Sequence, residues 1–350
     1  MRLFDGISAR VIQTPRLAVS ILERAADDPD TPETLTIALI HGNASSSLFW
    51  QEIMLAMPAD LRPIAIDLRG FGGSQRLPVD ASRGCGDFAD DVHATLTGLG
   101  LGPVHLVGWS MGGGVVMRYA LDHRVRSLTL QAPVSPYGFG GTARDGSLLT
   151  ADGAGTGAGG ANLDFVARLE AGDTGQTSPA SPRNVFRSTY VAPGYESDHE
   201  DVWVESMLST ATGVDHYPGD SIPSRSWPGF AAGRRGVLNT LAPTNFNTSA
   251  IVGLDPKPPI LWIRGSLDAI VSDASYLDLN MLGKAGILPD WPGLDLAPPQ
   301  PMLSQTRDVL EIYQANGGQV TELELAGVGH SPHLERPDEW LEAVVALVRG

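Results

Sequence analysis

The chain has 350 residues, 42% of them hydrophobic and 18% charged, enough to bury one large core or a core with a sizeable insertion. Its 24 basic and 40 acidic residues give a net charge of −16, which disfavours nucleic acid and anionic membrane surfaces as partners. The single cysteine, Cys85, excludes an intrachain disulfide. No apolar leader opens the sequence and no stretch reaches about 18 apolar residues, so we expect a cytoplasmic protein without a membrane span.

The first 134 residues alternate short apolar runs with amphipathic stretches. Runs that are apolar throughout predict strands buried on both faces, and the stretches between them have helical spacing. This alternation predicts a mostly parallel sheet with helices on both faces. The predicted strands cover residues 7–13, 17–24, 35–40, 63–67, 104–107 and 125–130, the predicted helices lie near 49–57, 87–99 and 113–121, and a polar linker covers 27–32.

The alternation stops after residue 134. Residues 135–250 lack the pattern of a buried strand, and we expect them to form a mainly helical cap inserted into a core made of 1–134 and 251–350. A glycine tract at 153–160 fits G-x-G-x-x-G, but no strand precedes it, so we interpret it as a flexible loop. Short helices are predicted near 162–171, 183–190, 199–211 and 234–241.

The sheet resumes beyond the insertion. Residues 260–264 form another apolar run, and Asp268 follows it closely. Residues 320–325 alternate apolar and polar, which is typical of a half-exposed outer strand, and they lead to His330. A final helix is predicted from Pro337 onward.

The most informative stretch is Gly108-Trp109-Ser110-Met111-Gly112, which fits G-x-S-x-G. An apolar strand pattern precedes it and a helical pattern follows it. Strand, sharp turn and helix are the context in which this motif presents a serine hydroxyl above the edge of a sheet. Glycines on both sides of the serine are expected, since side chains there would collide.

A serine hydroxyl becomes a nucleophile only with a base, and the base needs a partner that holds its tautomer. Asp268 and His330 each follow a predicted strand, and the carboxyl ends of parallel strands share one edge of the sheet. His333 is the alternative base, and Asp273, farther from its strand, is the weaker alternative acid. The order Ser110, Asp268, His330 is one of the known orders of a Ser-Asp-His triad.

With these motifs in this order, the chain resembles the α/β-hydrolase-fold serine hydrolases. The resemblance covers residues 35–134 and 258–349. The stretches that carry it are His41-Gly42-Asn43, residues 67–74, the motif around Ser110, residues 264–268 and residues 329–337.

The resemblance implies a role for each matching residue. Ser110 would be the nucleophile, His330 the general base and then acid, and Asp268 the orienting carboxylate. The backbone N–H groups of Asn43 and Met111 would form the oxyanion hole. Asn43 departs from the more usual pattern at its position in the family.

The resemblance further implies a cofactor-independent esterase or lactonase that needs no metal. Its expected partner is a small-molecule ester or lactone, with no nucleic acid and no membrane, and a homo-oligomer remains open. Trp109 and Ala44 are the candidate substrate contacts, although Trp109 could equally pack beside the serine.

Other activities of the same fold stay open at this point. Epoxide hydrolases and haloalkane dehalogenases use an aspartate where this chain has Ser110, which argues against both. Carbon–carbon bond hydrolases, cofactor-free haloperoxidases and peptidases keep the serine. A ligand receptor that retains the triad is an alternative of a different class, which turnover of a simple ester would distinguish.

Overall fold

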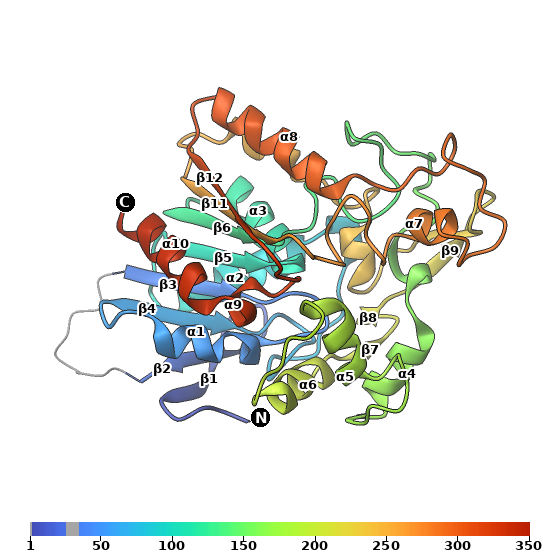
Figure 1. The fold of residues 1–350 in the computed structure, drawn as a ribbon. Helices are drawn as coiled ribbons and strands as arrows, with labels where there is room; N and C mark the ends of the chain where they lie inside the picture. The colour runs from blue at the N-terminus through green and yellow to red at the C-terminus, as the bar shows by residue number, and fades with distance from the viewer. Residues whose placement is uncertain (1, 26–34) are drawn as a thin grey trace.

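An eight-stranded sheet forms the centre of the computed structural model, which describes residues 2–25 and 35–350 (Figure 1). The predicted linker at 27–32 lies outside the described residues. The strands are β1 (Ile7–Gln13), β2 (Ala18–Arg24), β3 (Leu35–Ile40), β4 (Leu61–Ile66), β5 (His105–Trp109), β6 (Ser127–Gln131), β11 (Ile260–Gly265) and β12 (Val320–Leu325). Their order is β1-β2-β4-β3-β5-β6-β11-β12; β2 is antiparallel to both its neighbours, and all pairs from β4 to β12 are parallel.

Strand position follows the polarity of the sequence. The apolar strand β11 lies between β6 and β12, and all its residues are buried. β12 lies at the edge and exposes its polar residues, as its alternation predicts. Arg264 of β11 pairs there with Glu322, 2.7 Å away, and with Glu324. Charged side chains at an edge strand disfavour pairing with another chain.

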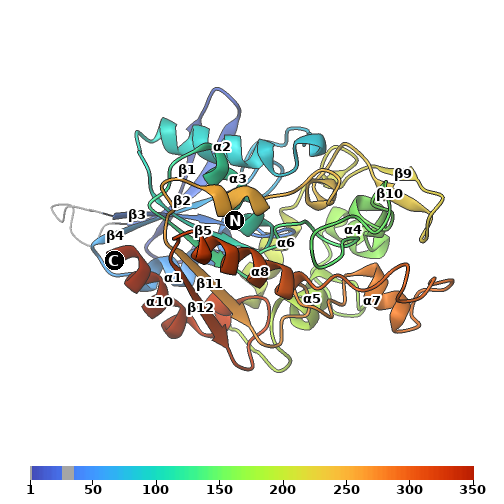
Figure 2. The same cartoon turned by 90° about the horizontal axis from the view of Figure 1, so that it is seen from above.

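Helices cover both faces of this sheet (Figure 2). On one face, α2 (Gly86–Gly98) contacts β1, and α3 (Met111–Asp122) contacts β3 and β5. On the other, α1 (Gln51–Ala56) contacts β2, and α10 (Pro337–Arg349) contacts β6 and β11. The predicted mostly parallel sheet between two helical layers is therefore confirmed. The remaining helices outside the insertion are α7 (Leu279–Lys284), α8 (Met302–Ala315), α9 (Pro332–Glu335), η1 (Ser47–Trp50), η2 (Ala81–Arg83) and η6 (Ser249–Gly253).

Residues 135–250, called the insert below, leave the sheet after β6 and return before β11. They lie beyond the carboxyl ends of the parallel strands (Figure 1). A short helix occurs in or near each of the four predicted ranges, and two small sheets that the pattern did not predict pair β7 with β8 and β9 with β10. Its elements are η3 (Gly157–Gly160), α4 (Leu163–Glu170), α5 (Pro182–Val185), the π-helix η4 (Phe186–Tyr190), α6 (Glu200–Leu208), β7 (Thr212–Gly213), β8 (Tyr217–Pro218), β9 (Ser221–Pro223), β10 (Phe230–Ala232) and η5 (Leu238–Leu241).

The glycine tract at 153–160, interpreted from sequence as a flexible loop, is packed into the insert. Thr156 is buried, and Asn239 Oδ1 accepts the N–H of Ala158 at 2.9 Å. A Cβ at Gly157 would lie 2.2 Å from Asn239 Oδ1. Close packing therefore explains the small residues in this tract better than flexibility does.

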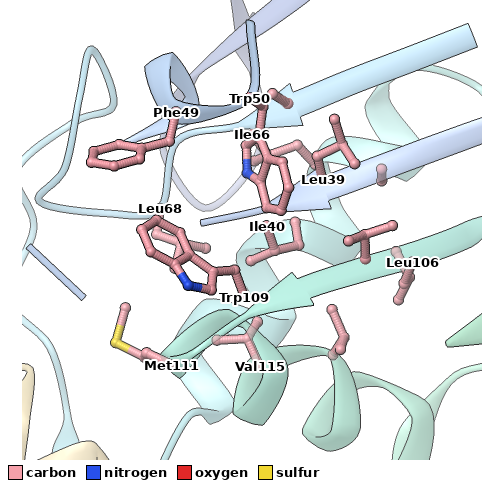
Figure 3. Close-up of a cluster of buried hydrophobic side chains, with 14 of the residues drawn as sticks. Leu39, Ile40, Phe49, Trp50, Ile66, Leu68, Leu106, Trp109, Met111 and Val115 are labelled. Carbon is pink, nitrogen blue, oxygen red and sulfur yellow. The ribbon is translucent and has the colours of Figure 1, made fainter. Parts of the chain in front are cut away.

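Phe49, Trp50 and Trp109 pack with aliphatic side chains in the buried core (Figure 3). Trp50 and Trp109 are both fully buried. The Trp109 ring lies 5.0 Å from that of Phe49 and 6.4 Å from that of Trp50, measured between centroids.

None of the helices in residues 2–25 and 35–350 combines the length and apolar character needed to cross a membrane.

Candidate active site

Ser110 occupies the turn between β5 and α3. Its φ of 58° and ψ of −118° lie in a region that residues other than glycine rarely adopt. The surrounding backbone holds it there: its N–H donates to Gln131 O at 2.9 Å, and its carbonyl accepts the N–H groups of Gly113 and Val134. The serine side chain stays partly exposed although its neighbours are buried.

Crowding around this turn requires the glycines of the motif. A Cβ at Gly108 would lie 2.2 Å from Gly112 O, so it would collide with the backbone of the motif rather than with a side chain. A Cβ at Gly112 would instead meet Ile40 O, at 2.4 Å, on the neighbouring strand β3. The second glycine therefore lets helix α3 approach the sheet.

Asp268 and His330 meet at the end of the adjacent strands β11 and β12. Backbone bonds join the loops that follow these strands: Ser266 N–H donates to Leu325 O at 3.0 Å and Leu267 N–H to Val328 O at 2.8 Å. His330 Nδ1 then lies 2.8 Å from Asp268 Oδ2. Both side chains are almost completely buried, which excludes water from this contact.

The second oxygen of Asp268 is also occupied. Oδ1 accepts the backbone N–H groups of Ile270 at 2.8 Å and Val271 at 2.9 Å. The carboxylate is thus fixed in orientation with Oδ2 turned to the imidazole. Since Nδ1 carries the hydrogen in that contact, Nε2 of His330 is left as the proton acceptor.

Ser110 and His330 both line one cavity of about 550 Å³. Within the described residues no hydrogen bond joins the serine hydroxyl to Nε2 of His330, and such catalytic hydrogen bonds are often long before substrate binds. The cavity thus brings a serine, a buried imidazole and its carboxylate partner to one place.

The proposed oxyanion donors border the same cavity. Met111 is the first residue of α3, and Asn43 follows the end of β3 by three residues. The side chain of His41 braces this loop: Nδ1 donates to Gly42 O at 2.7 Å, and Nε2 accepts the N–H of Leu68 at 3.0 Å. Burial lowers the pKa of His41, which keeps the ring neutral for both bonds.

The lining of the cavity is mainly apolar, and among the described residues it includes no lysine or arginine. Its one carboxylate belongs to Asp278, whose two oxygens accept the N–H groups of Asn280 and Gln300. Burial raises the pKa of Asp278. Most of the lining comes from the insert and from residues 270–288, including Phe139, Phe165, Val185, Tyr190, Tyr217, Leu238, Leu241, Ile270, Leu279 and Leu282.

The two candidate substrate contacts lie beside the cavity but are buried. Trp109 Nε1 donates to His330 O at 2.8 Å, so this indole supports the histidine loop. Trp109 is fully buried and Ala44 is 1% exposed, although both border the cavity. Ala44 has a φ of 45°, which marks a tight turn in the loop that carries Asn43.

The alternative base and acid lie elsewhere. His333 is buried on α9, where the side-chain amide of Gln131 donates to its Nδ1 at 2.7 Å. Burial lowers the pKa of His333 to about 3. Asp273 accepts the N–H and hydroxyl of Ser304 at the surface. Neither residue borders the cavity.

Two further residues, Tyr190 and Glu335, contact the loops of the site, and neither was a candidate site residue in the sequence analysis. The hydroxyl of Tyr190, from the insert, donates to Asn43 O at 2.8 Å. The carboxylate of Glu335 accepts the N–H of Gly329, next to His330, and the N–H of Ala192. Tyr190 was visible in the sequence only as one of many aromatic residues in the insert.

No group of three or more histidine, cysteine or acidic residues able to hold a metal ion occurs in the described parts of the chain.

Comparison with known proteins gives partial sequence matches. A family model described as the alpha/beta hydrolase fold matches residues 36–152. A non-heme chloroperoxidase from Kitasatospora aureofaciens is 39% identical over 104 residues, 29% of this chain and 37% of that protein. A monoacylglycerol lipase from Xenopus laevis is 32% identical over 102 residues, 28% of this chain and 30% of that protein. The matched stretches thus span about a third of the length of these relatives.

Among solved structures, an esterase from Exiguobacterium antarcticum superposes with a TM-score of 0.59. The superposition covers 98% of this chain and 100% of that one, at 15% identity. At this identity the likeness concerns the arrangement of the chain, and the chemistry must be argued from the residues themselves.

Proposed function

Since this chain is an α/β-hydrolase-fold protein, as its motifs predict, we propose that it is a cofactor-independent serine hydrolase that cleaves a carboxylic ester or lactone. The observation that carries the proposal is the buried Asp268–His330 pair facing the same cavity as a strained, partly exposed serine. A histidine with its tautomer held by a carboxylate is the base that a serine nucleophile requires.

In the proposed reaction Ser110 Oγ attacks the ester carbonyl carbon while Nε2 of His330 takes the hydroxyl proton. The N–H groups of Asn43 and Met111 stabilise the oxyanion that forms. The carbon–oxygen bond to the alcohol then breaks, and His330 gives its proton to the leaving oxygen. Water attacks the acyl-serine by the reverse sequence: His330 takes a proton from water, and returns one to Ser110 as the acid leaves.

The cavity favours neutral substrates with a large apolar part. Its apolar lining would bury such a group, and its volume of about 550 Å³ is in the range of small-molecule sites. An anionic substrate would find no cationic side chain there and would have to approach the carboxylate of Asp278. Burying an unpaired charge is expensive, so anionic esters should be poor substrates.

We further propose that the insert, residues 135–250, acts as a cap on a core made of 1–134 and 251–350. Side chains of the insert such as Phe165, Tyr190 and Tyr217 supply much of the cavity lining opposite Ser110. A substrate held between the two parts would contact both, so the insert would shape the choice of acyl or alcohol group.

The first test is labelling and turnover of the whole chain. We expect a fluorophosphonate probe to label Ser110, identified by peptide mass spectrometry, and Ser110→Ala to remain unlabelled. We expect p-nitrophenyl butyrate to turn over repeatedly, with kcat/KM at least roughly tenfold above that of a singly charged succinate monoester. Labelling at another residue, or none, would contradict the proposed nucleophile.

A cofactor-free haloperoxidase is the second candidate, because a matched relative is a non-heme chloroperoxidase. Halide oxidation by added hydrogen peroxide that exceeds ester turnover would favour it. Labelling of Ser110 followed by neither reaction would favour a carbon–carbon bond hydrolase or a ligand receptor. Detection of products by mass spectrometry from a panel of esters and lactones separates ester hydrolysis from these other outcomes.

A further inference from the structure

One short part of the insert contacts both loops that the proposed reaction uses. Residues 190–195, called the bridging segment below, begin at Tyr190, the last residue of the π-helix η4. π-helical turns are uncommon and occur often at functional sites. The contacts of this segment give the insert a role beyond lining the cavity.

At its first residue, the bridging segment holds the loop that carries Asn43. The hydroxyl of Tyr190 lies 2.8 Å from Asn43 O and 3.2 Å from Ala44 O. The residue is buried, and its ring centroid lies 5.8 Å from that of Trp109 and 6.3 Å from that of His330. Burial raises the pKa of Tyr190, so the hydroxyl stays protonated as a donor.

The Tyr190 bond to Asn43 O holds the peptide group that directly follows the one carrying the Asn43 N–H. A peptide group is planar, so holding its carbonyl also holds the N–H on its other side. Gly42 O, in the peptide that contains the Asn43 N–H, accepts from Ser45 Oγ at 2.9 Å. Asn43 O, in the next peptide, accepts from Tyr190. Asn43 is thus held on both sides, once by its own loop and once by the insert.

At Ala192 the bridging segment holds the loop that carries His330. The N–H of Ala192 donates to Glu335 Oε2 at 2.8 Å. The two oxygens of Glu335 accept the N–H of Gly329 at 2.9 and 3.0 Å, directly before His330. A Cβ at Gly329 would lie 2.5 Å from Ala192 N, so the two backbones are in direct contact.

We propose that the bridging segment positions both catalytic loops, with Tyr190 as a positioning residue for the oxyanion hole and Glu335 as one for the His330 loop. This inference rests on the proposed function. It makes the insert part of the catalytic arrangement, because a displacement of a fraction of an ångström in an oxyanion donor lowers the rate. The bonds from Tyr190 and through Glu335 are the links that carry this effect.

The test compares two tyrosine-to-phenylalanine variants of the whole chain. Tyr190→Phe keeps the ring and removes the bonds to the oxyanion loop. Tyr313→Phe is the matched control, since Tyr313 is also buried and donates to Pro258 O at 2.6 Å, from α8 and outside the cavity lining. Both are measured for kcat and KM with p-nitrophenyl butyrate, for thermal unfolding, and for inhibition by a trifluoromethyl ketone that forms a tetrahedral oxyanion with the serine.

We expect Tyr190→Phe to lower kcat roughly tenfold or more with KM changed less than about threefold, and to weaken the ketone by a similar factor. Tyr313→Phe should lose stability but keep kcat and ketone affinity. Glu335→Gln tests the other loop, since its amide group places a donor against an N–H, and its kcat should also fall. It serves as the test if Tyr190→Phe does not fold.

Two outcomes would overturn the inference in different ways. If the unchanged protein hydrolyses the ester, and Tyr190→Phe and Glu335→Gln match Tyr313→Phe in kcat and ketone affinity, the inference fails and the proposed function stands. If the unchanged protein neither turns over esters nor reacts with a fluorophosphonate, the proposed function fails and the inference fails with it.

Discussion

The turn at Ser110 and the bridging segment, through Tyr190, border the same cavity, yet only the first is visible as a sequence motif. In this turn backbone packs against backbone, and glycine is the only residue type small enough for positions 108 and 112. The bridging segment acts largely through the tyrosine hydroxyl of Tyr190 and the backbone N–H of Ala192. Any residue except proline supplies a backbone N–H, and tyrosines are common in buried positions.

The difference teaches that a sequence motif reveals a position where only glycine fits more readily than it reveals a hydrogen bond between distant segments. Gly265 and Gly329 extend the pattern, since a Cβ at Gly265 would lie 2.1 Å from Gly329 O. Glu335, by contrast, has no such steric signature although it links two loops. The following predictions test how strongly activity and stability depend on the Ser110 turn and on the hydrogen bonds around it.

The largest effect is expected at the turn itself. Ser110→Ala should lower kcat for ester hydrolysis by roughly 10⁶-fold, the loss typical of a serine-protease nucleophile. The methyl group of alanine fits the same backbone, so circular dichroism and thermal unfolding should change little. Activity within tenfold of the unchanged protein, in a preparation free of other esterases, would remove Ser110 from the mechanism.

Much of this turn and its sheet could be predicted from the sequence for a physical reason. Buried parallel strands are mainly apolar, and β3 and β11 are short runs of this kind. Asp268 and His330 follow adjacent strands, so topology alone predicts that they lie near each other. Their contact at 2.8 Å adds an orientation that spacing could not give.

The rest depended on contacts between segments far apart in the chain. Helix α7 (Leu279–Lys284) is short, and the sequence pattern did not predict a helix there. The glycine tract at 153–160 is ordered by Asn239, some 80 residues away, which no local pattern reveals. Tyr190 meets the oxyanion loop at a separation of 147 residues. Such pairings follow from the packed fold and leave no periodic signal.

A smaller loss is expected when only the partner of His330 changes. Asp268→Asn keeps the hydroxyl and the imidazole but places an amide where Nδ1 needs an acceptor, so the wrong tautomer is favoured. We expect kcat to fall roughly 10⁴-fold, while fluorophosphonate labelling slows rather than disappears. An Asp268→Asn variant with full activity would mean that another carboxylate orients the histidine.

The steric requirement at the turn can be measured separately from catalysis. Gly112→Ala should lower the free energy of unfolding by about 1–3 kcal/mol, because its Cβ would lie 2.4 Å from Ile40 O on β3. Gly98→Ala, near the end of α2, is the matched control, with its closest contact 3.4 Å from Ile12 Cγ2. Alanine favours a helix by up to about 1 kcal/mol over glycine, so the control should be neutral or stabilised in urea unfolding. Equal stability of the two variants would show that α3 can move away from the sheet.

The mildest effect on activity is expected at His333, which packs against Trp109 but does not border the cavity. Its Nδ1 accepts a hydrogen bond from Gln131, and its ring lies 4.5 Å from that of Trp50. Burial lowers its pKa to about 3, from an ordinary value of 6.5. Between these values the unfolded chain binds a proton that the folded chain does not, so this residue makes stability decrease as the pH falls from 6.5 toward 3.

His333→Asn retains an oxygen near the position of Nδ1 and removes the titrating group. We expect kcat at about pH 7 to stay within roughly tenfold of the unchanged protein, because Ser110 and His330 keep their surroundings. The loss of unfolding free energy between about pH 7 and about pH 4 should be smaller in the variant by an amount on the order of 3 kcal/mol. Urea unfolding at both pH values measures this difference directly, and other buried histidines such as His105 cancel in the comparison because they occur in both proteins. An equal loss in the two proteins would mean that His333 takes up its proton in the folded state as readily as in the unfolded one, and that the core beneath the site tolerates charge.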